Sequence, residues 1–95
     1  MSKRVKLLMA IYGMGSRPFT LAEMCVAAWE SDRAAWGMQG YEMQYPDNKR
    51  IEVTFYGQGF VARGIVRKLD ESRWTMTEEG ANIARKSMER NQCSF

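Results

Sequence analysis

The chain has 95 residues, of which 45% are hydrophobic and 12% aromatic, and its formal net charge is only +3. A chain of this length forms one domain with a modest core, and its aromatic content excludes an intrinsically disordered protein. Histidine is absent and there are only two cysteines, which excludes histidine-based catalysis, a thiolate zinc site and a disulfide framework. We therefore predict a single domain, residues 1–95, with its core at about 3–90 and a flexible tail at 91–95.

The apolar segments and the two cysteines bear on the localisation of the protein. The apolar run at 7–12 follows three basic residues but is shorter than the ~7–15 residues of a signal-peptide core, and no small-residue cleavage site follows it. No segment approaches the ~20 apolar residues of a membrane span. Cys25 lies in an apolar run and is expected in the core, whereas Cys93 is expected to be solvated. This cysteine usage is typical of a reducing compartment, and we predict a cytoplasmic protein.

Two amphipathic helices are predicted in the first third of the chain. Apolar residues recur at helical spacing in the first, which ends at Gly13, and its expected buried stripe is Val5, Leu8, Met9 and Tyr12. Thr20 and Glu23 form a capping box that begins the second helix. The expected buried stripe of this helix is Leu21, Met24, Cys25 and Ala28.

The segment 31–46 is predicted to be a loop that packs onto these helices. Ser31 or Asp32 can cap a short turn, and Gly37, Gly40 and Pro46 interrupt any longer element. The apolar residues of the segment are too many for a solvated linker: Trp36, Met38, Tyr41 and Met43.

Two interpretations remain open for residues 48–62. Asp47 is a good N-cap, and Ile51 and Phe55 share a helix face. The alternation from Ile51 to Tyr56 also fits a strand, and each glycine at 57 and 59 weakens a helix by about 1 kcal/mol. We favour the helix because the segment Phe60 to Gly64 is typical of a last helical turn closed by a glycine.

A β-hairpin and a closing helix are predicted in the last third. Strands at 65–69 and 73–76 flank an acidic turn at 70–72. Thr77 is the expected N-cap of a helix that runs to about Arg90, with two glutamates in its first turn. The three tryptophans at 29, 36 and 74 are expected to pack in or at the edge of the core.

With these elements in place, the chain resembles winged helix-turn-helix domains. The resemblance is to the domains of MarR-type and PadR-type regulators and to the N-terminal domain of Mrr-type restriction proteins. The resemblance spans roughly residues 19–85 and rests on two segments, Arg63-Gly64-Ile65-Val66 and Trp74-Thr75-Met76-Thr77-Glu78-Glu79-Gly80. It implies an α+β fold, mostly α, with a C-terminal hairpin as the wing and a closing helix. The chain departs from the family in its long aromatic linker at 31–46 and in the glycines of the recognition helix.

The resemblance implies binding of double-stranded DNA, with helix 48–62 in the major groove and hairpin 65–76 on phosphates. Arg50 has the chemistry to recognise guanine, and Asn48 or Gln58 that to recognise adenine. The full set of candidate DNA-binding residues is Asn48, Lys49, Arg50, Thr54, Gln58, Arg63, Arg67, Lys68 and Arg73. A transcriptional regulator that binds as a homodimer through its first and last helices is the expected biological form.

Other interpretations remain open beside this one. The cations can form a solvated face only, and Glu52 within the proposed DNA-reading face counts against DNA. A protein-interaction adaptor would use the aromatic loop from Trp36 to Tyr45, and a small accessory protein of a mobile element is a further alternative. No enzyme, cofactor or metal is predicted, since the glycines match neither the dinucleotide fingerprint nor a phosphate loop.

Overall fold

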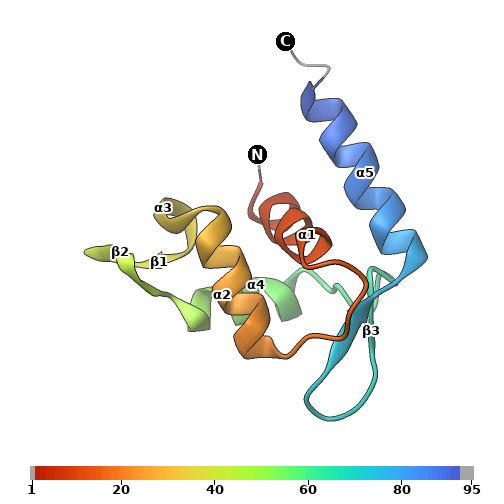
Figure 1. The fold of residues 1–95 in the computed structure, drawn as a ribbon, viewed down its shortest axis with the longest axis horizontal. Coiled ribbons are helices and arrows are strands. Elements are labelled where there is room, and N and C mark those ends of the chain that lie inside the picture. The colour runs from red at the N-terminus through yellow and green to blue at the C-terminus, as the bar shows by residue number, and fades with distance from the viewer. Residues whose placement is uncertain (1, 93–95) are drawn as a thin grey trace.

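The computed structural model describes residues 2–92 (Figure 1). It is a small α+β fold in which helices predominate, as the sequence predicts, with two separate antiparallel hairpins. In chain order the described elements are α1 (Lys3–Gly13), α2 (Leu21–Ser31), α3 (Arg33–Trp36), β1 (Gly37–Met38), β2 (Tyr41–Pro46), α4 (Asn48–Gly57), β3 (Val66–Lys68), β4 (Trp74–Met76) and α5 (Glu78–Gln92).

Side-chain caps begin the longer helices. The predicted capping box of α2 is present: Thr20 Oγ1 accepts from the Glu23 amide at 3.2 Å, and the Glu23 carboxylate accepts from the Thr20 amide at 3.0 Å. Asp47 caps α4, and Thr77 caps α5 by accepting from the Gly80 amide at 2.9 Å. These caps satisfy amides that have no partner within the helix, which is why the predicted helix starts are correct.

One hydrophobic core joins α1, α2, α4 and the base of the β3–β4 hairpin. Cys25, Trp36 and Trp74 lie in it, as predicted, and the stripe of α2 is buried at Met24, Cys25 and Ala28. The largest fully buried side chains are Trp36, Phe55, Phe60, Leu7, Ile11, Met24, Ile51, Val66 and Cys25.

The predicted stripe of α1 is only partly correct. Leu8 is buried as predicted, but Val5, Met9 and Tyr12 are only half-buried, and Leu7 and Ile11, outside the predicted stripe, are fully buried. The reason is that α1 contacts α2, α4 and α5, so its buried surface is wider than a single stripe.

The prediction of a packed loop at 31–46 is wrong. The segment forms the short helix α3, capped by Asp32, and then the β1–β2 hairpin. Trp36 is buried at the base, but Tyr41 and Met43 are 56% and 64% exposed. Gly40, with φ +86°, permits the tight turn between the two strands. In the sequence, this glycine followed by alternating residues from Tyr41 could have indicated a hairpin.

Residues 48–57 are helical and not a strand, but the predicted helix 48–62 is too long. The helix α4 ends at Gly57, and residues 58–64 form successive turns. Gly59 and Gly64 have φ of +66° and +76°, a conformation that no right-handed helix continues through. Phe60 is therefore buried from a turn, and the segment 60–64 is not the last turn of this helix.

The predicted C-terminal hairpin is present as β3 and β4, in the register Val66↔Met76 and Lys68↔Trp74. A second contact fastens it to the rest of the molecule, because Phe19 and Trp74 exchange two backbone hydrogen bonds of 2.7 and 2.9 Å. The closing helix α5 continues to Gln92, two residues beyond the prediction. Cys93 and most of the predicted tail lie outside the described residues. None of the helices in residues 2–92 is both long and apolar enough to cross a membrane.

Candidate nucleic-acid interface

The exposed side of α4 carries fewer polar groups than the sequence suggests. Because Ile51 and Phe55 face the core, the opposite side presents Lys49, Val53 and Tyr56 to solvent. Val53 and Tyr56 are 61% and 58% exposed. The centre of this helix face is therefore apolar, with Asn48 and Lys49 exposed at one end and Gln58 exposed just after the other.

Arg50 is engaged within the protein. Its Nε lies 3.6 Å from the Asp47 carboxylate, and its Nη1 donates to the Ala35 carbonyl at 3.4 Å. The side chain is half-buried and fastens the start of α4 to the end of α3. Arg50 would have to give up these contacts before its guanidinium reached a guanine.

The remaining polar groups of α4 are also partly occupied. The Thr54 hydroxyl donates to the Arg50 carbonyl at 2.9 Å, and Thr54 is half-buried. At the N-terminus, the Asp47 carboxylate accepts from the Arg50 amide at 3.1 Å. An acid already occupies the amides that a phosphate would otherwise use, so the helix N-terminus is a poor phosphate site.

The β3–β4 hairpin presents cations with different surroundings. Arg67 and Lys68 are exposed neighbours on β3, so they point to opposite faces, and Lys68 Nζ lies 5.5 Å from the Trp74 ring centroid. Arg73 is paired with Asp70 through a 2.7 Å contact, and this hydrogen bond holds the pKa of Asp70 below its usual value. Arg67 and Lys68 are therefore the hairpin cations best placed for an outside anion, and Arg63 is exposed on the preceding turn.

Aromatic contacts hold α4 and this hairpin together. The rings of Phe55 and Trp74 meet edge to face with centroids 5.8 Å apart, and Phe55 also contacts Phe60 at 5.5 Å. Figure 1 shows α4 between the two hairpins, with the β3–β4 hairpin following the turn at its end. The candidate residues on the helix, the turn and the hairpin are thus parts of one packed unit.

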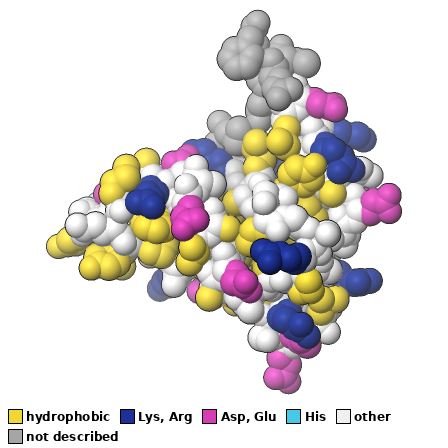
Figure 2. Space-filling view, viewed as in Figure 1, with side chains coloured by type: hydrophobic (Ala, Val, Ile, Leu, Met, Phe, Trp, Pro, Cys, Tyr) yellow, Lys and Arg dark blue, Asp and Glu magenta, His cyan; other side chains and the backbone are white. Residues whose placement is uncertain are grey.

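The β1–β2 hairpin forms an exposed apolar surface within the segment that the sequence offered as a protein contact, although it is a hairpin and not a loop. Hydrogen bonds attach the hairpin to α2 and α3, since Trp29 Nε1 of α2 donates to the Glu42 carbonyl at 2.7 Å and Arg33 Nη1 of α3 donates to the Met43 carbonyl at 3.1 Å. Figure 2 shows hydrophobic side chains gathered over this projecting end of the molecule. The residues that form the surface are Met38, Tyr41, Met43 and Tyr45, all about half exposed or more.

The possible metal ligands and the one described cysteine, Cys25, were compared with the requirements of a metal or thiol site. No cluster of three or more metal-ligating side chains occurs within residues 2–92. Burial, and secondly the nearby Glu52 carboxylate, raises the pKa of Cys25 to about 11, so this thiol is protonated at neutral pH.

No known protein family, curated protein or solved structure is significantly similar to this chain.

Proposed function

We propose that the protein binds double-stranded DNA through the β3–β4 hairpin, the turn before it and the exposed side of α4, as a winged-helix regulator would. The observation that carries this proposal is the aromatic attachment of the hairpin to α4 through Phe55 and Trp74, which presents the exposed cations Arg67 and Lys68 beside a solvent-facing helix. In support, α1, α2, α4, the β3–β4 hairpin and α5 follow one another as expected for such a domain, with α3 and the β1–β2 hairpin as an additional segment between α2 and α4.

The geometry changes the expected roles of the candidate residues. Four exposed cations are placed to bind DNA phosphates: Lys49, Arg63, Arg67 and Lys68. Phosphate contacts supply most of the affinity of protein–DNA interfaces. Arg50 and Arg73 serve the fold through Asp47 and Asp70. Base contacts fall to Asn48 and Gln58, while Val53 and Tyr56 suit the methyl groups of thymine.

A salt series on a labelled random-sequence duplex tests this proposal by fluorescence anisotropy. Replacing Arg67 and Lys68 with alanine should lower the slope of log K against log salt by about 2, since each phosphate contact contributes about 0.9. The matched control replaces Lys86 and Arg90 of α5, which removes the same charge at exposed positions further along the helix from the hairpin. An equal loss in both double variants, or no binding at low salt, would contradict the proposal.

A protein-interaction adaptor is the second candidate function. The specific observation in its favour is the exposed apolar surface of the β1–β2 hairpin, where Tyr41 and Tyr45 are 56% and 54% exposed. Trp36 cannot take part because it is fully buried. We expect that replacing both Tyr41 and Tyr45 with serine leaves the affinity for DNA unchanged. That result would assign the β1–β2 surface to a role other than DNA binding. A regulator of this kind is also expected to form a homodimer through α1 and α5. Sedimentation of the unmodified chain and of its variants measures this self-association.

A further inference from the structure

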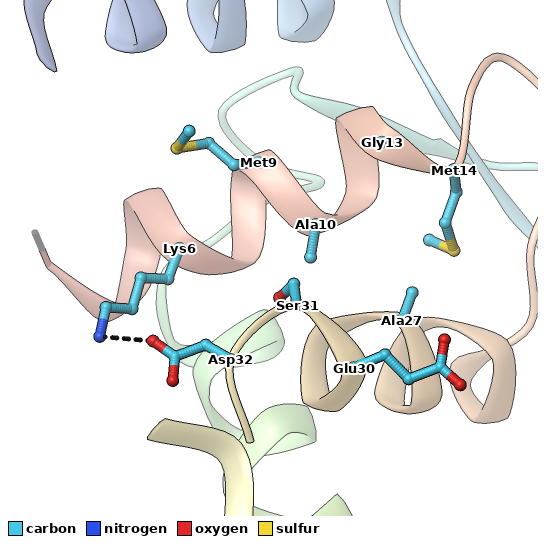
Figure 3. A pocket seen from close by; sticks show the side chains of 9 residues that line it. All are labelled: Lys6, Met9, Ala10, Gly13, Met14, Ala27, Glu30, Ser31 and Asp32. Carbon is cyan, nitrogen blue, oxygen red and sulfur yellow. Dashed lines mark ion pairs between the residues drawn. The ribbon is translucent and has the colours of Figure 1, made fainter. Parts of the chain in front are cut away.

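A hollow in the surface lies between α1 and α2, away from the residues assigned to DNA. It has a volume of about 520 Å³ and is drawn in Figure 3. Ala10 of α1 and Ala27 of α2 lie between the two helices, Met14 lies at one end, and the Lys6–Asp32 ion pair of 3.1 Å lies at the other. We call this hollow, together with its extension along α2, the α1–α2 groove.

The groove extends beyond the first hollow. A second hollow of about 430 Å³ shares Met14, Ala27 and Glu30 with the first and continues to Ala22, Glu23 and Val26. From Ala22 to Asp32 the groove follows α2 over about 15 Å, at the helical rise of 1.5 Å per residue. That length matches about three turns of a partner helix.

The floor of the groove is apolar, and only part of it is shared with the core. Ala10 belongs to the core and Met14 packs against it, whereas Ala27 and Val26 do not. The core side of α2 is Met24, Cys25 and Ala28, so Ala27 and the 45% exposed Val26 belong to a different side of the helix. At Gly13 of α1 an added Cβ would have no neighbour within 4 Å, which shows how open the space is. Small residues along the floor and methionines at the walls suit the insertion of large apolar side chains.

The rim of the groove is acidic although the chain as a whole is basic. Three carboxylates, Glu23, Glu30 and Asp32, stand against the one ammonium of Lys6, which leaves a net charge of −2. Lys6 neutralises Asp32, whereas neither Glu23 nor Glu30 forms an ion pair within residues 2–92. The formal charge of the whole chain is +3, so the groove repels the polyanion that the hairpin attracts.

From this shape and charge we propose that the α1–α2 groove docks an amphipathic helix of another protein, with an apolar ridge flanked by lysines or arginines. Apolar ridge and basic flanks complement the small-residue floor and the glutamate rim, in the helix-in-groove mode of recognition. A second copy of this chain fits less well. Between residues 78 and 90, the exposed side of α5 carries Arg85, Lys86 and Arg90 but no exposed large apolar side chain that could enter the groove. On α4, the half-buried Glu52 stands next to the exposed Val53.

The probe is a labelled 18-residue designed helix with leucines at i, i+3, i+4 and i+7 and lysines on both flanks, titrated against the whole chain by fluorescence anisotropy. Because the groove is small, we expect saturable binding with a Kd on the order of 10 μM at low salt. A matched peptide with glutamates in place of the lysines should bind at least about tenfold more weakly, and this difference should shrink as salt rises.

Variants of the chain place the binding in the groove. Gly13→Leu adds a large side chain to the lining of the groove and Glu30→Lys reverses the charge at its rim, and each should weaken binding of the lysine peptide about tenfold or more. Glu89→Lys makes the same charge change on α5 and should leave binding almost unchanged. Thermal unfolding verifies the fold of each variant, and Glu30 is exposed, so its replacement tests the proposal even if leucine at 13 perturbs α1.

Three outcomes would overturn the proposal. The first is an absence of saturable binding by the lysine peptide, and the second is equal weakening by Glu30→Lys and Glu89→Lys. The third is sedimentation showing a dimer that Gly13→Leu dissociates, which would make a second copy the occupant. The groove proposal does not depend on DNA binding, so each can fail while the other holds.

Discussion

At the scale of single residues, two glycines show how differently the same residue type is used. A Cβ at Gly80 would lie 2.1 Å from the Ile65 carbonyl oxygen, so the first turn of α5 sits directly on the backbone that leads into β3. At Gly57, the last residue of α4, an added Cβ would have no neighbour within 4 Å. One glycine is required by a contact between elements, and the other has no contact that excludes a side chain.

The two alanine variants should therefore change stability in opposite directions. Gly80→Ala should lower the free energy of unfolding by about 2–3 kcal/mol, because the backbone of Ile65 must move to admit the methyl group. Gly57→Ala should raise it by up to about 1 kcal/mol, since alanine loses less backbone entropy in a helix. Urea unfolding measures both changes. A neutral Gly80→Ala would contradict the close packing of α5 on this backbone.

At the scale of elements, Thr77 joins the hairpin to the closing helix. Its Oγ1 accepts from the Gly80 amide at 2.9 Å as the N-cap of α5, and its hydroxyl lies within hydrogen-bond distance of the Gly64 and Ile65 carbonyls. Its amide donates to the Ile65 carbonyl at 3.0 Å. Thr20, by contrast, acts only as an N-cap: its hydroxyl accepts from the Glu23 amide in the capping box that begins α2.

Valine substitutions at these two threonines separate the two roles. Thr20→Val should cost about 1 kcal/mol, the usual value of an N-cap. Thr77→Val should cost about 2 kcal/mol or more, because carbonyls at the start of the hairpin also lose their hydroxyl donor. Thr77→Ser keeps the hydroxyl and should cost well under 1 kcal/mol. Equal costs for both valine variants, measured by urea unfolding, would show that Thr77 is only a cap.

At the scale of the whole molecule, the two hairpins are attached to the core in different ways. The β3–β4 hairpin buries Val66 and Trp74 and is fastened to the α1–α2 connection by the hydrogen bonds of Phe19. The β1–β2 hairpin is buried only at its base, at Trp36 and Gly37, and its tip is exposed on both strands. Local opening of the β1–β2 hairpin therefore exposes little additional apolar surface to water.

Native-state hydrogen exchange should reveal this difference. The amides of Phe19 and Trp74 should exchange only through global unfolding, because their hydrogen bonds lie within the core. Hydrogen-bonded amides of the β1–β2 hairpin should exchange through local opening, with a free energy lower by about 2 kcal/mol or more. Equal protection in both hairpins, measured by NMR, would mean that the exposed apolar surface is covered in solution.

Much of the candidate site could be predicted from the sequence, because exposed cations in a turn and hairpin follow from local pattern. Arg63, Arg67 and Lys68 are exposed as the sequence indicates. The engagement of Arg50 could not be predicted, since its partner carbonyl at Ala35 lies 15 residues away. The exposure of Val53 and Tyr56 likewise depends on which side of α4 meets the core.

The starts of α2, α4 and α5 and the C-terminal hairpin follow from local sequence, because caps and tight turns are contacts between residues a few positions apart. For residues 48–57 the local pattern allowed both a helix and a strand, and the packed structure forms the helix. The tertiary structure also sets the breadth of the buried side of α1 and the exposure of the β1–β2 surface. It alone also decided the α1–α2 groove. These features arise where segments distant in the chain pack or leave space, and no local pattern specifies the partner of a packed surface.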